Sequence, residues 1–262
     1  MIQAFGEAIQ FLRARPFSLL GMGLIILVQA GIALIQLPIA SYFISTLDFG
    51  TLLEAFDGVQ LLVFVLLALI GMVLNFSGFL WVAQQVKIWK TPSGEKASLQ
   101  LLKSSGLVTV AIILFMGLAL GITGILASLL EVLGFIGLFV LGICMLLMIY
   151  CIIKFAFVLP LMGFGAGLKP ALQQSWRITQ SHFFGTIGVL VGLFIITTLI
   201  DLIVQIVIGQ LDTELIAIPL NFISAVALTT YGAAVLACAI PLREIESMPG
   251  MRPHAHTRAA MK

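Results

Sequence analysis

The side chains that could do acid–base, nucleophilic or metal chemistry in this chain are few and far apart. The histidines are His182, His254 and His256. No other ligand residues accompany the last two, so we interpret them as a chance pair in a polar tail. No Ser-His-acid order, HExxH motif, Walker loop or dinucleotide-binding glycine fingerprint stands in a suitable context. We therefore expect no catalytic activity, no bound metal and no cofactor.

The remaining reactive side chains lie in apolar surroundings. Cys144, Cys151 and Cys238 fall inside apolar runs, where a small buried residue is favoured over metal or disulfide chemistry. Lys154 and Asp201 are the ionisable residues nearest to mid-membrane depth. The pattern places the lysine at one membrane edge, where it can snorkel, and the aspartate near the opposite edge. We do not expect these two residues to pair.

The elements that carry these residues are those of a membrane protein. Hydrophobic residues make up 61% of the chain and charged residues only 9%, whereas soluble domains have about 25% charged residues. At roughly 20 apolar residues per crossing, the 262 residues allow about six spans and leave no room for a soluble catalytic domain. We predict an all-α polytopic membrane protein with six transmembrane helices arranged as three hairpins.

Apolar runs define the predicted spans. These are residues 17–37, 59–82, 106–129, 133–153, 184–204 and 216–241. The first run is too long for a signal-peptide core, so we predict a span rather than cleavage near Ala40. Residues 38–58 are too polar to cross and are predicted to form a partly interfacial loop. We predict one membrane domain over residues 1–246 and a disordered cytoplasmic tail over 247–262.

The stretch 155–184 between predicted spans four and five has a different character. Pro160 and the alternate glycines Gly163, Gly165 and Gly167 are predicted to bend the apolar run along the membrane interface. A two-sided helix follows, and such a helix lies flat on a membrane. Its polar face is predicted to carry Lys169, Gln173, Arg177 and Gln180, and its apolar face Leu168, Leu172, Trp176 and Phe183.

Two further short amphipathic helices are predicted, over residues 2–13 and within residues 91–105. Similar triplets occupy matching places in all three: Ala8-Ile9-Gln10, Ser98-Leu99-Gln100 and Ala171-Leu172-Gln173. Each triplet is followed by a basic residue and then by a predicted span. We predict a repeated unit of interfacial helix, crossing, outer turn and return crossing, used three times.

Charged residues are segregated by side under this arrangement. All 13 Lys and Arg residues fall on the side of the short helices. The charged residues on the opposite side are all acidic, namely Asp48, Glu54, Asp57, Glu131, Asp201, Asp212 and Glu214. Because basic residues near spans resist translocation, we predict a plasma (cytoplasmic) membrane protein with both termini and all three short helices in the cytoplasm.

A family resemblance rests on the stretch between spans four and five. Pro160-Leu161, Gly165-x-Gly167 and the run from Ala171 through Ser175-Trp176-Arg177-Ile178-Thr179 resemble the signature of a six-helix membrane domain. That domain is attached to some glycerophosphoryl diester phosphodiesterases and also occurs in related stand-alone membrane proteins. The chain has Met162, Gly163 and Phe164 where family members often place an acid, so a role for that acid does not transfer. The resemblance implies the fold and not the phosphodiesterase activity, because the catalytic barrel has no counterpart.

Predicted span six carries a small and polar ridge. Ala217, Asn221, Ala225, Thr229, Ala233 and Ala237 recur at every fourth residue. Such a ridge favours close helix packing, with Asn221 and Thr229 hydrogen-bonding across it. The alternative is an intramembrane polar groove formed by Asn221 and Thr229 with Asn75 and Ser77 of span two.

Two functions from different classes follow. The first is a non-catalytic scaffold or accessory protein with a basic cytoplasmic rim that binds lipid headgroups or a protein partner. The rim residues are Lys96, Lys103, Lys169 and Arg177. Each base near an anionic surface contributes on the order of 1 kcal/mol. The alternative is a transporter or lipid-handling protein that uses the polar groove. We prefer the scaffold, expect no nucleic-acid partner, and leave the oligomeric state open.

Overall fold

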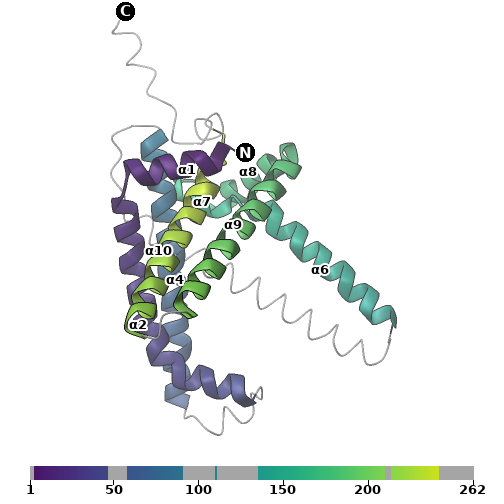
Figure 1. Ribbon diagram of the computed structural model, residues 1–262. Helices are drawn as coiled ribbons and strands as arrows, with labels where there is room; N and C mark the ends of the chain where they lie inside the picture. The colour runs from purple at the N-terminus through teal and green to yellow at the C-terminus, as the bar shows by residue number, and fades with distance from the viewer. Residues whose placement is uncertain (1–2, 47–57, 91–109, 111–134, 210–213, 242–262) are drawn as a thin grey trace, which may run out of the picture.

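The computed structural model describes residues 3–46, 58–90, 110, 135–209 and 214–241, and the regular structure in these ranges is helical (Figure 1). The helices are α1 (Gln3–Ala14), α2 (Phe17–Thr46), α4 (Gly58–Lys90), α6 (Phe135–Phe155), α7 (Val158–Gly163), α8 (Leu168–Ser181), α9 (Phe183–Gly209) and α10 (Glu214–Cys238). The all-α prediction is confirmed for these residues.

Within the described residues, 5 helical segments are long and apolar enough to cross a membrane. They are Phe17–Leu37, Leu62–Lys90, Leu146–Gly163, Phe183–Gly209 and Ala217–Cys238. Each corresponds to a predicted span, and a multi-pass membrane protein is thereby confirmed. The remaining predicted span, residues 106–129, lies outside the described residues. The six-span count and the three-hairpin arrangement therefore stay predictions.

The helices extend beyond two of the predicted boundaries. The loop predicted over 38–58 begins too early, because α2 continues through Pro38 to Thr46. A proline inside a helix removes only one backbone hydrogen bond, which the rest of a long helix can tolerate at a local cost. Likewise α4 runs on to Lys90 instead of ending near residue 82, and Lys87 and Lys90 in its last turn find partners inside the protein.

Helices α2 and α4 pack antiparallel and are joined by hydrogen bonds from two half-buried glutamine side chains. The Gln29 side-chain amide donates to the Gly71 carbonyl at 2.9 Å, and the Gln36 amide donates to the Phe64 carbonyl at 2.9 Å. From the first pair to the second, the α2 residue advances by seven positions and the α4 residue goes back by seven, as antiparallel helices require. Interhelical hydrogen bonds of this kind contribute about 0.6 kcal/mol each in a membrane.

Helices α9 and α10 also run antiparallel, and α10 packs against most of the other elements. The Gln205 side chain of α9 donates to Asn221 of α10 at 3.2 Å. Closer to the α1 end, Gly232 of α10 faces the Leu193 side chain of α9. Helix α10 contacts α1, α2, α4, α7 and α9. It therefore forms the centre of the bundle.

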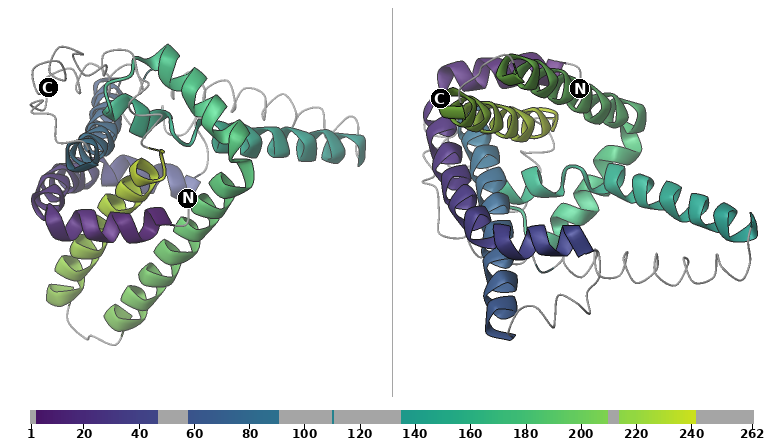
Figure 2. Two further views of the ribbon diagram at one scale, coloured as in Figure 1. Left: turned by 90° about the horizontal axis from the view of Figure 1, so that it is seen from above. Right: turned by 60° about the horizontal axis from the view of Figure 1, so that its bottom comes forward.

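The buried core is concentrated at one end of the bundle, which we call the α1 end. There α1 lies across the ends of the long helices, and α7 and α8 lie at the same level (Figures 1 and 2). Phe11, Phe157, Phe164, Leu80 and Ile240 are among the largest fully buried side chains. Helix α6 contacts chiefly α8 and α9 at its C-terminal end and extends away from the other helices (Figure 2).

Helices α1 and α8 each lead into a span through a similar junction. The Ser18 hydroxyl donates to the Arg15 carbonyl at 2.7 Å, and the Thr186 hydroxyl donates to the His182 carbonyl at 3.1 Å. Both hydroxyl residues are buried. The first and third predicted units thus share a short helix, a sharp junction and a hydroxyl residue in the first turn of the span. The corresponding short helix and first span of the middle unit lie outside the described residues.

Candidate functional site

Helix α8 is present as predicted and packs on the protein through Ala171, Ser175, Ile178 and Thr179, which are its buried residues. Of the predicted apolar face, Trp176 is 41% exposed, and Leu168, Leu172 and Phe183 are half-buried. The small residues of the helix permit close approach, and its buried hydroxyl groups find backbone partners. The expectation that the apolar face lies on the membrane stays a prediction.

Ser175 holds α8 against the break between α6 and α7. Its hydroxyl donates to the Lys154 carbonyl at 2.8 Å and accepts from the Phe157 N–H at 3.3 Å. A break between two helices leaves some backbone carbonyl and N–H groups without helical partners. The Ser175 hydroxyl bonds to one such carbonyl and one such N–H. Helix α6 ends at Phe155, five residues before Pro160, so the proline does not make this first break, whereas the predicted glycines do lie at the bend between α7 and α8. Pro160 lies in the first turn of α7, where no N–H is needed.

Trp176 covers a buried lysine at the same break. Lys154 is 3% exposed, and its ammonium lies 4.9 Å from the Trp176 ring centroid, 5.4 Å from that of Tyr150 and 5.7 Å from that of Phe183. These distances are within the range of cation–π attraction, about 6 Å. The lysine was expected to snorkel at the membrane edge. Instead α6, α8 and α9 enclose it with aromatic rings.

The short helix α7 packs closely on α4. Both Gly163 and the preceding Met162 are buried, and a Cβ added at Gly163 would lie 2.7 Å from the Leu80 carbonyl oxygen. Gly165 follows with φ of 100°, a conformation that favours glycine. The buried Lys87 of α4 donates to the Phe164 carbonyl at 3.1 Å and so caps the end of α7. An acid at positions 162 to 164 would be buried against α4.

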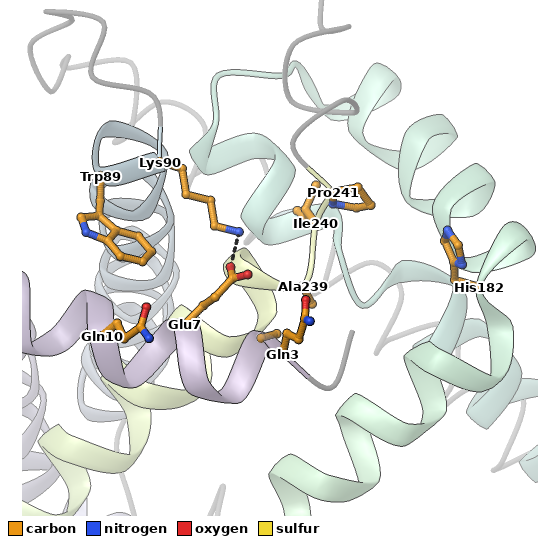
Figure 3. A pocket seen from close by; sticks show the side chains of 10 residues that line it. Gln3, Glu7, Gln10, Trp89, Lys90, His182, Ala239, Ile240 and Pro241 are labelled. Carbon is orange, nitrogen blue, oxygen red and sulfur yellow. Dashed lines mark ion pairs between the residues drawn. The ribbon is translucent and has the colours of Figure 1, made fainter.

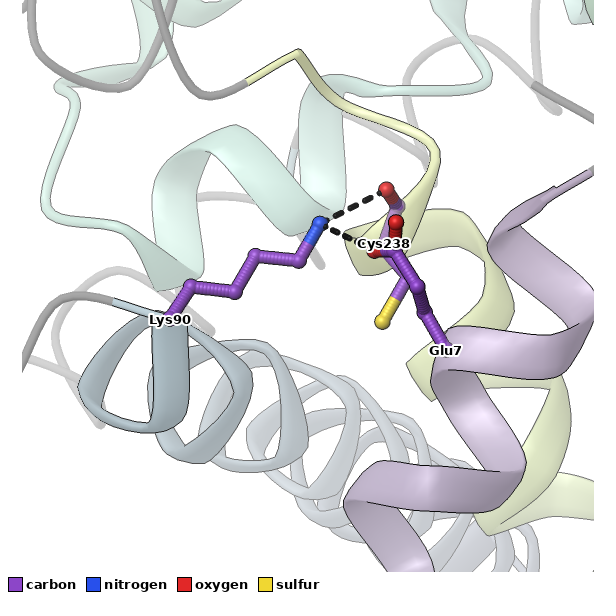
Figure 4. Close-up of polar contacts among 3 residues, drawn as sticks. All are labelled: Glu7, Lys90 and Cys238. Carbon is purple, nitrogen blue, oxygen red and sulfur yellow. Dashed lines mark hydrogen bonds and ion pairs between the residues drawn. The ribbon is translucent and has the colours of Figure 1, made fainter.

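A second lysine of α4 joins three segments that are distant in sequence. The Lys90 ammonium lies 2.7 Å from the Glu7 carboxylate of α1 and donates to the Cys238 carbonyl of α10 at 2.9 Å (Figure 4). The Lys90 side chain is 10% exposed and that of Glu7 is 37% exposed. Charge-assisted contacts at this depth are stronger than those on an open surface, so α1 is held here to the ends of α4 and α10.

An open polar groove of about 580 Å³ adjoins this junction. Its charged and titratable side chains are Glu7, Lys90 and His182, and Trp89 forms another part of its wall. It is also lined by Gln3, Ala4, Gln10, Ala239, Ile240 and Pro241. Figure 3 shows Glu7 and Lys90 meeting inside the groove, with His182 on the opposite side from Trp89. The groove can therefore offer charges of both signs to one small molecule.

The predicted rim is only partly within the described residues. Lys169 and Arg177 lie on the exposed face of α8, as do Gln173 and Gln180, so the predicted polar face is confirmed as exposed. Lys96 and Lys103 lie outside the described residues. All described basic residues are on elements of the α1 end, namely Arg13, Arg15, Lys87, Lys90, Lys154, Lys169 and Arg177.

The residues of the predicted intramembrane groove lie on α4 and α10. Asn75 and Asn221 are exposed, while Ser77 and Thr229 are half-buried. The Ser77 hydroxyl donates to the Val73 carbonyl at 2.7 Å. None of the four lines the polar groove at the α1 end. None lines a second, apolar groove of about 450 Å³ between α2 and α10 either. A groove built by these four residues stays a prediction.

The inward contacts of Glu7, Lys87 and Lys90 were not predicted from the sequence. The sequence held one signal of these contacts. Glu7 of the first short helix and the two lysines, three residues apart, all fall on the predicted cytoplasmic side, where opposite charges can pair. Charge pattern alone could not identify all partners of the lysines, because Lys87 and Lys90 each donate to a backbone carbonyl. Among the described residues, no group of three or more His, Cys, Asp or Glu side chains could hold a metal ion.

The long apolar helices, the short helices across their ends and the buried polar junctions define a multi-pass helical membrane protein. Residues 133–240, less than half of the chain, match the family model described as the membrane domain of glycerophosphoryl diester phosphodiesterase. The resemblance drawn from the α7–α8 signature is thereby confirmed for this segment. The match concerns the membrane domain alone, with no catalytic domain detected. Comparisons with curated proteins and with solved structures gave no match.

Proposed function

We propose that this chain is a non-catalytic membrane scaffold or accessory protein that binds anionic lipid headgroups along the outer face of α8. One observation carries the proposal: α8 is held to the protein by its small and hydroxyl residues, while Lys169 and Arg177 face outward. A base near an anionic membrane surface contributes about 1 kcal/mol. Lys96 and Lys103 belong to the same proposed rim.

The proposal includes a topology. Six spans, as three hairpins built from repeated units, would place both termini, α1 and α8 on the cytoplasmic side of the plasma membrane. The location of every described basic residue at the α1 end supports this orientation, because such residues are retained on the cytoplasmic side. Asp201, in the distal half of α9, agrees with the opposite charge bias.

Two alternatives are weaker on present observations. A transporter would use Asn75, Ser77, Asn221 and Thr229 as a polar path, but Asn221 already accepts a hydrogen bond from Gln205 of α9. That contact favours helix packing. A soluble protein partner could also use the α8 face, and its binding would then depend on Lys169 and Arg177 in the absence of anionic lipid.

Tryptophan fluorescence tests the lipid proposal directly. A chain with Trp81→Phe and Trp89→Phe keeps Trp176, the residue next to Arg177, as its one tryptophan. In reconstituted bilayers, brominated phosphatidylglycerol should quench this residue more strongly than brominated phosphatidylcholine. Replacing Lys169 and Arg177 together by Gln should remove the preference for the anionic lipid, because the local positive charge is lost.

The matched control keeps the charges and changes the side chains, as Lys169→Arg with Arg177→Lys. This variant should retain the preference for anionic lipid. Equal quenching by the two lipids in the chain with native bases would overturn the proposal. A preference that persists after both bases are neutralised would do the same.

A further inference from the structure

The polar groove at the α1 end combines one carboxylate and one ammonium in a space suited to a small ligand. We propose that it binds a zwitterionic phosphate headgroup, in which a phosphate is joined to an ammonium by a short linker. Its volume of about 580 Å³ falls within the 300–1,000 Å³ typical of ligand pockets. This site is separate from the α8 face and does not depend on the function proposed for it.

Lys90 is positioned to bind the phosphate. An ammonium has three N–H donors, and the contacts with Glu7 and the Cys238 carbonyl occupy two of them. The third can donate to a phosphate oxygen. These same contacts hold Lys90 in place at the end of α4, so little side-chain entropy is lost when a ligand binds.

Glu7 and Trp89 can bind the ammonium end. A carboxylate has two oxygens and about four lone-pair sites, of which the Lys90 contact uses one oxygen, and 37% of the Glu7 side chain is exposed. Trp89 is fixed by an edge contact with Phe11, with ring centroids 6.0 Å apart. A tryptophan ring is the best aromatic partner for a quaternary or primary ammonium.

The pairing of charges decides the class of ligand. A simple anion bound to Lys90 would be repelled by the adjacent Glu7 carboxylate. A simple cation bound to Glu7 would be repelled by the Lys90 ammonium. A zwitterion satisfies both groups. His182, the third titratable side chain of the groove, has a ring N–H that can donate to a phosphate oxygen.

The groove also lies at the depth where headgroups are found. Trp89 and Lys90 end the candidate span Leu62–Lys90, and tryptophan and lysine mark membrane interfaces. The headgroup could belong to a membrane lipid or to a soluble molecule of the same chemistry. The experiment below separates these two sources.

The test is native mass spectrometry of the full chain released from mixed micelles with equal amounts of phosphatidylcholine and phosphatidylglycerol. The chain should retain phosphatidylcholine in preference. Gln10→Trp fills the groove beside Glu7 and should lower this retention at least fivefold. Ile9→Trp is the matched control, because Ile9 is the exposed neighbour of Gln10 on α1 and does not line the groove, and it should retain phosphatidylcholine like the unaltered chain.

A second variant tests the charge argument. Glu7→Gln removes the partner of the ammonium and should lower the ratio of phosphatidylcholine to phosphatidylglycerol by about tenfold, the effect of losing one charge-assisted contact. If this variant fails to fold, Gln3→Trp and Gln10→Trp still test the groove by blocking it. Soluble phosphocholine that displaces the lipid indicates that the headgroup alone is bound. Failure to displace it indicates a lipid ligand held also by its chains.

Equal phosphatidylcholine retention by Gln10→Trp and Ile9→Trp overturns the proposal, as does an unchanged lipid ratio in Glu7→Gln. The result is distinguishable from failure of the scaffold proposal, because neutralising Lys169 and Arg177 should lower binding of phosphatidylglycerol and leave the amount of retained phosphatidylcholine unchanged.

Discussion

Buried polar side chains at the α1 end act mainly on the ends of helices. Lys87 donates to the Phe164 carbonyl after α7, Lys90 to the Cys238 carbonyl at the end of α10, and Ser175 to the Lys154 carbonyl near the end of α6. Helix C-termini carry partial negative charge and carbonyls without intrahelical partners, so lysines and hydroxyls are favourable there. The serine and tryptophan of the family signature thus have structural tasks in this chain.

Ser175→Ala should lower the free energy of unfolding by about 1–3 kcal/mol, because it leaves the buried Phe157 N–H without a partner. The measurement is unfolding by a denaturing detergent titrated into mild micelles. Ser181→Ala on the same helix is the control. Its hydroxyl donates to the Ile178 carbonyl from an exposed position, so a change within about 0.5 kcal/mol is expected. Equal effects of the two changes would contradict the bridging role.

Lys154 and Trp176 should be energetically coupled. A double-mutant cycle with Lys154→Met and Trp176→Leu is expected to give a coupling free energy of about 1 kcal/mol, because the ammonium lies 4.9 Å from the indole centroid in a buried place. The same detergent titration measures it. As a comparison, Lys154→Met with Ser181→Ala should be additive. A Lys154–Trp176 coupling near zero would show that the ring only packs and does not attract the charge.

At the scale of elements, short helices determine how the long ones meet. Helix α7 fits against α4 through Gly163, and α8 fits against the α6–α7 break through Ser175. Elsewhere, side chains inside the spans set the register, as Gln29 and Gln36 do between α2 and α4. In lipid there is little hydrophobic force between helices, so close approach and hydrogen bonds decide which faces pair.

Gly163→Ala should destabilise the protein by about 1–3 kcal/mol, because the added Cβ would lie 2.6 Å from the Ala83 Cβ and 2.7 Å from the Leu80 oxygen. Gly188→Ala provides a control of opposite sign. No atom lies within 4 Å of an added Cβ there, and alanine is favoured over glycine in a helix by up to about 1 kcal/mol. Unfolding midpoints of the two variants should therefore move in opposite directions. A neutral or stabilising Gly163→Ala would refute the close approach of α7 to α4.

At the scale of the whole molecule, the basic residues and the packed core share one end. The other halves of α2, α9 and α10 expose large apolar side chains such as Leu34, Ile206 and Ile218, as expected where lipid is the solvent. The distribution favours a protein that is rigid at one membrane surface and more loosely packed through the bilayer.

Cysteine labelling tests the proposed orientation. In a chain whose 3 native cysteines are replaced, Gln180→Cys on α8 and Gly209→Cys at the far end of α9 are both exposed. A membrane-impermeant maleimide should label the second on intact cells and the first only after the membrane is opened, because bases hold the α1 end in the cytoplasm. The reverse result would invert the topology and remove the scaffold from the face assigned to it.

The sequence by itself determined the class of protein, most of the spans, the exposed polar face of α8 and the family of residues 133–240, because long apolar runs and helical periodicity are local properties. Only the tertiary structure decided that Ser175 bridges a broken helix, that aromatic rings enclose Lys154 and that Glu7 meets Lys90. Such contacts join side chains to partners far along the chain, and the bond from Lys90 to the Cys238 carbonyl spans 148 residues. No pattern along the chain specifies a partner that is a carbonyl group, since every residue has one.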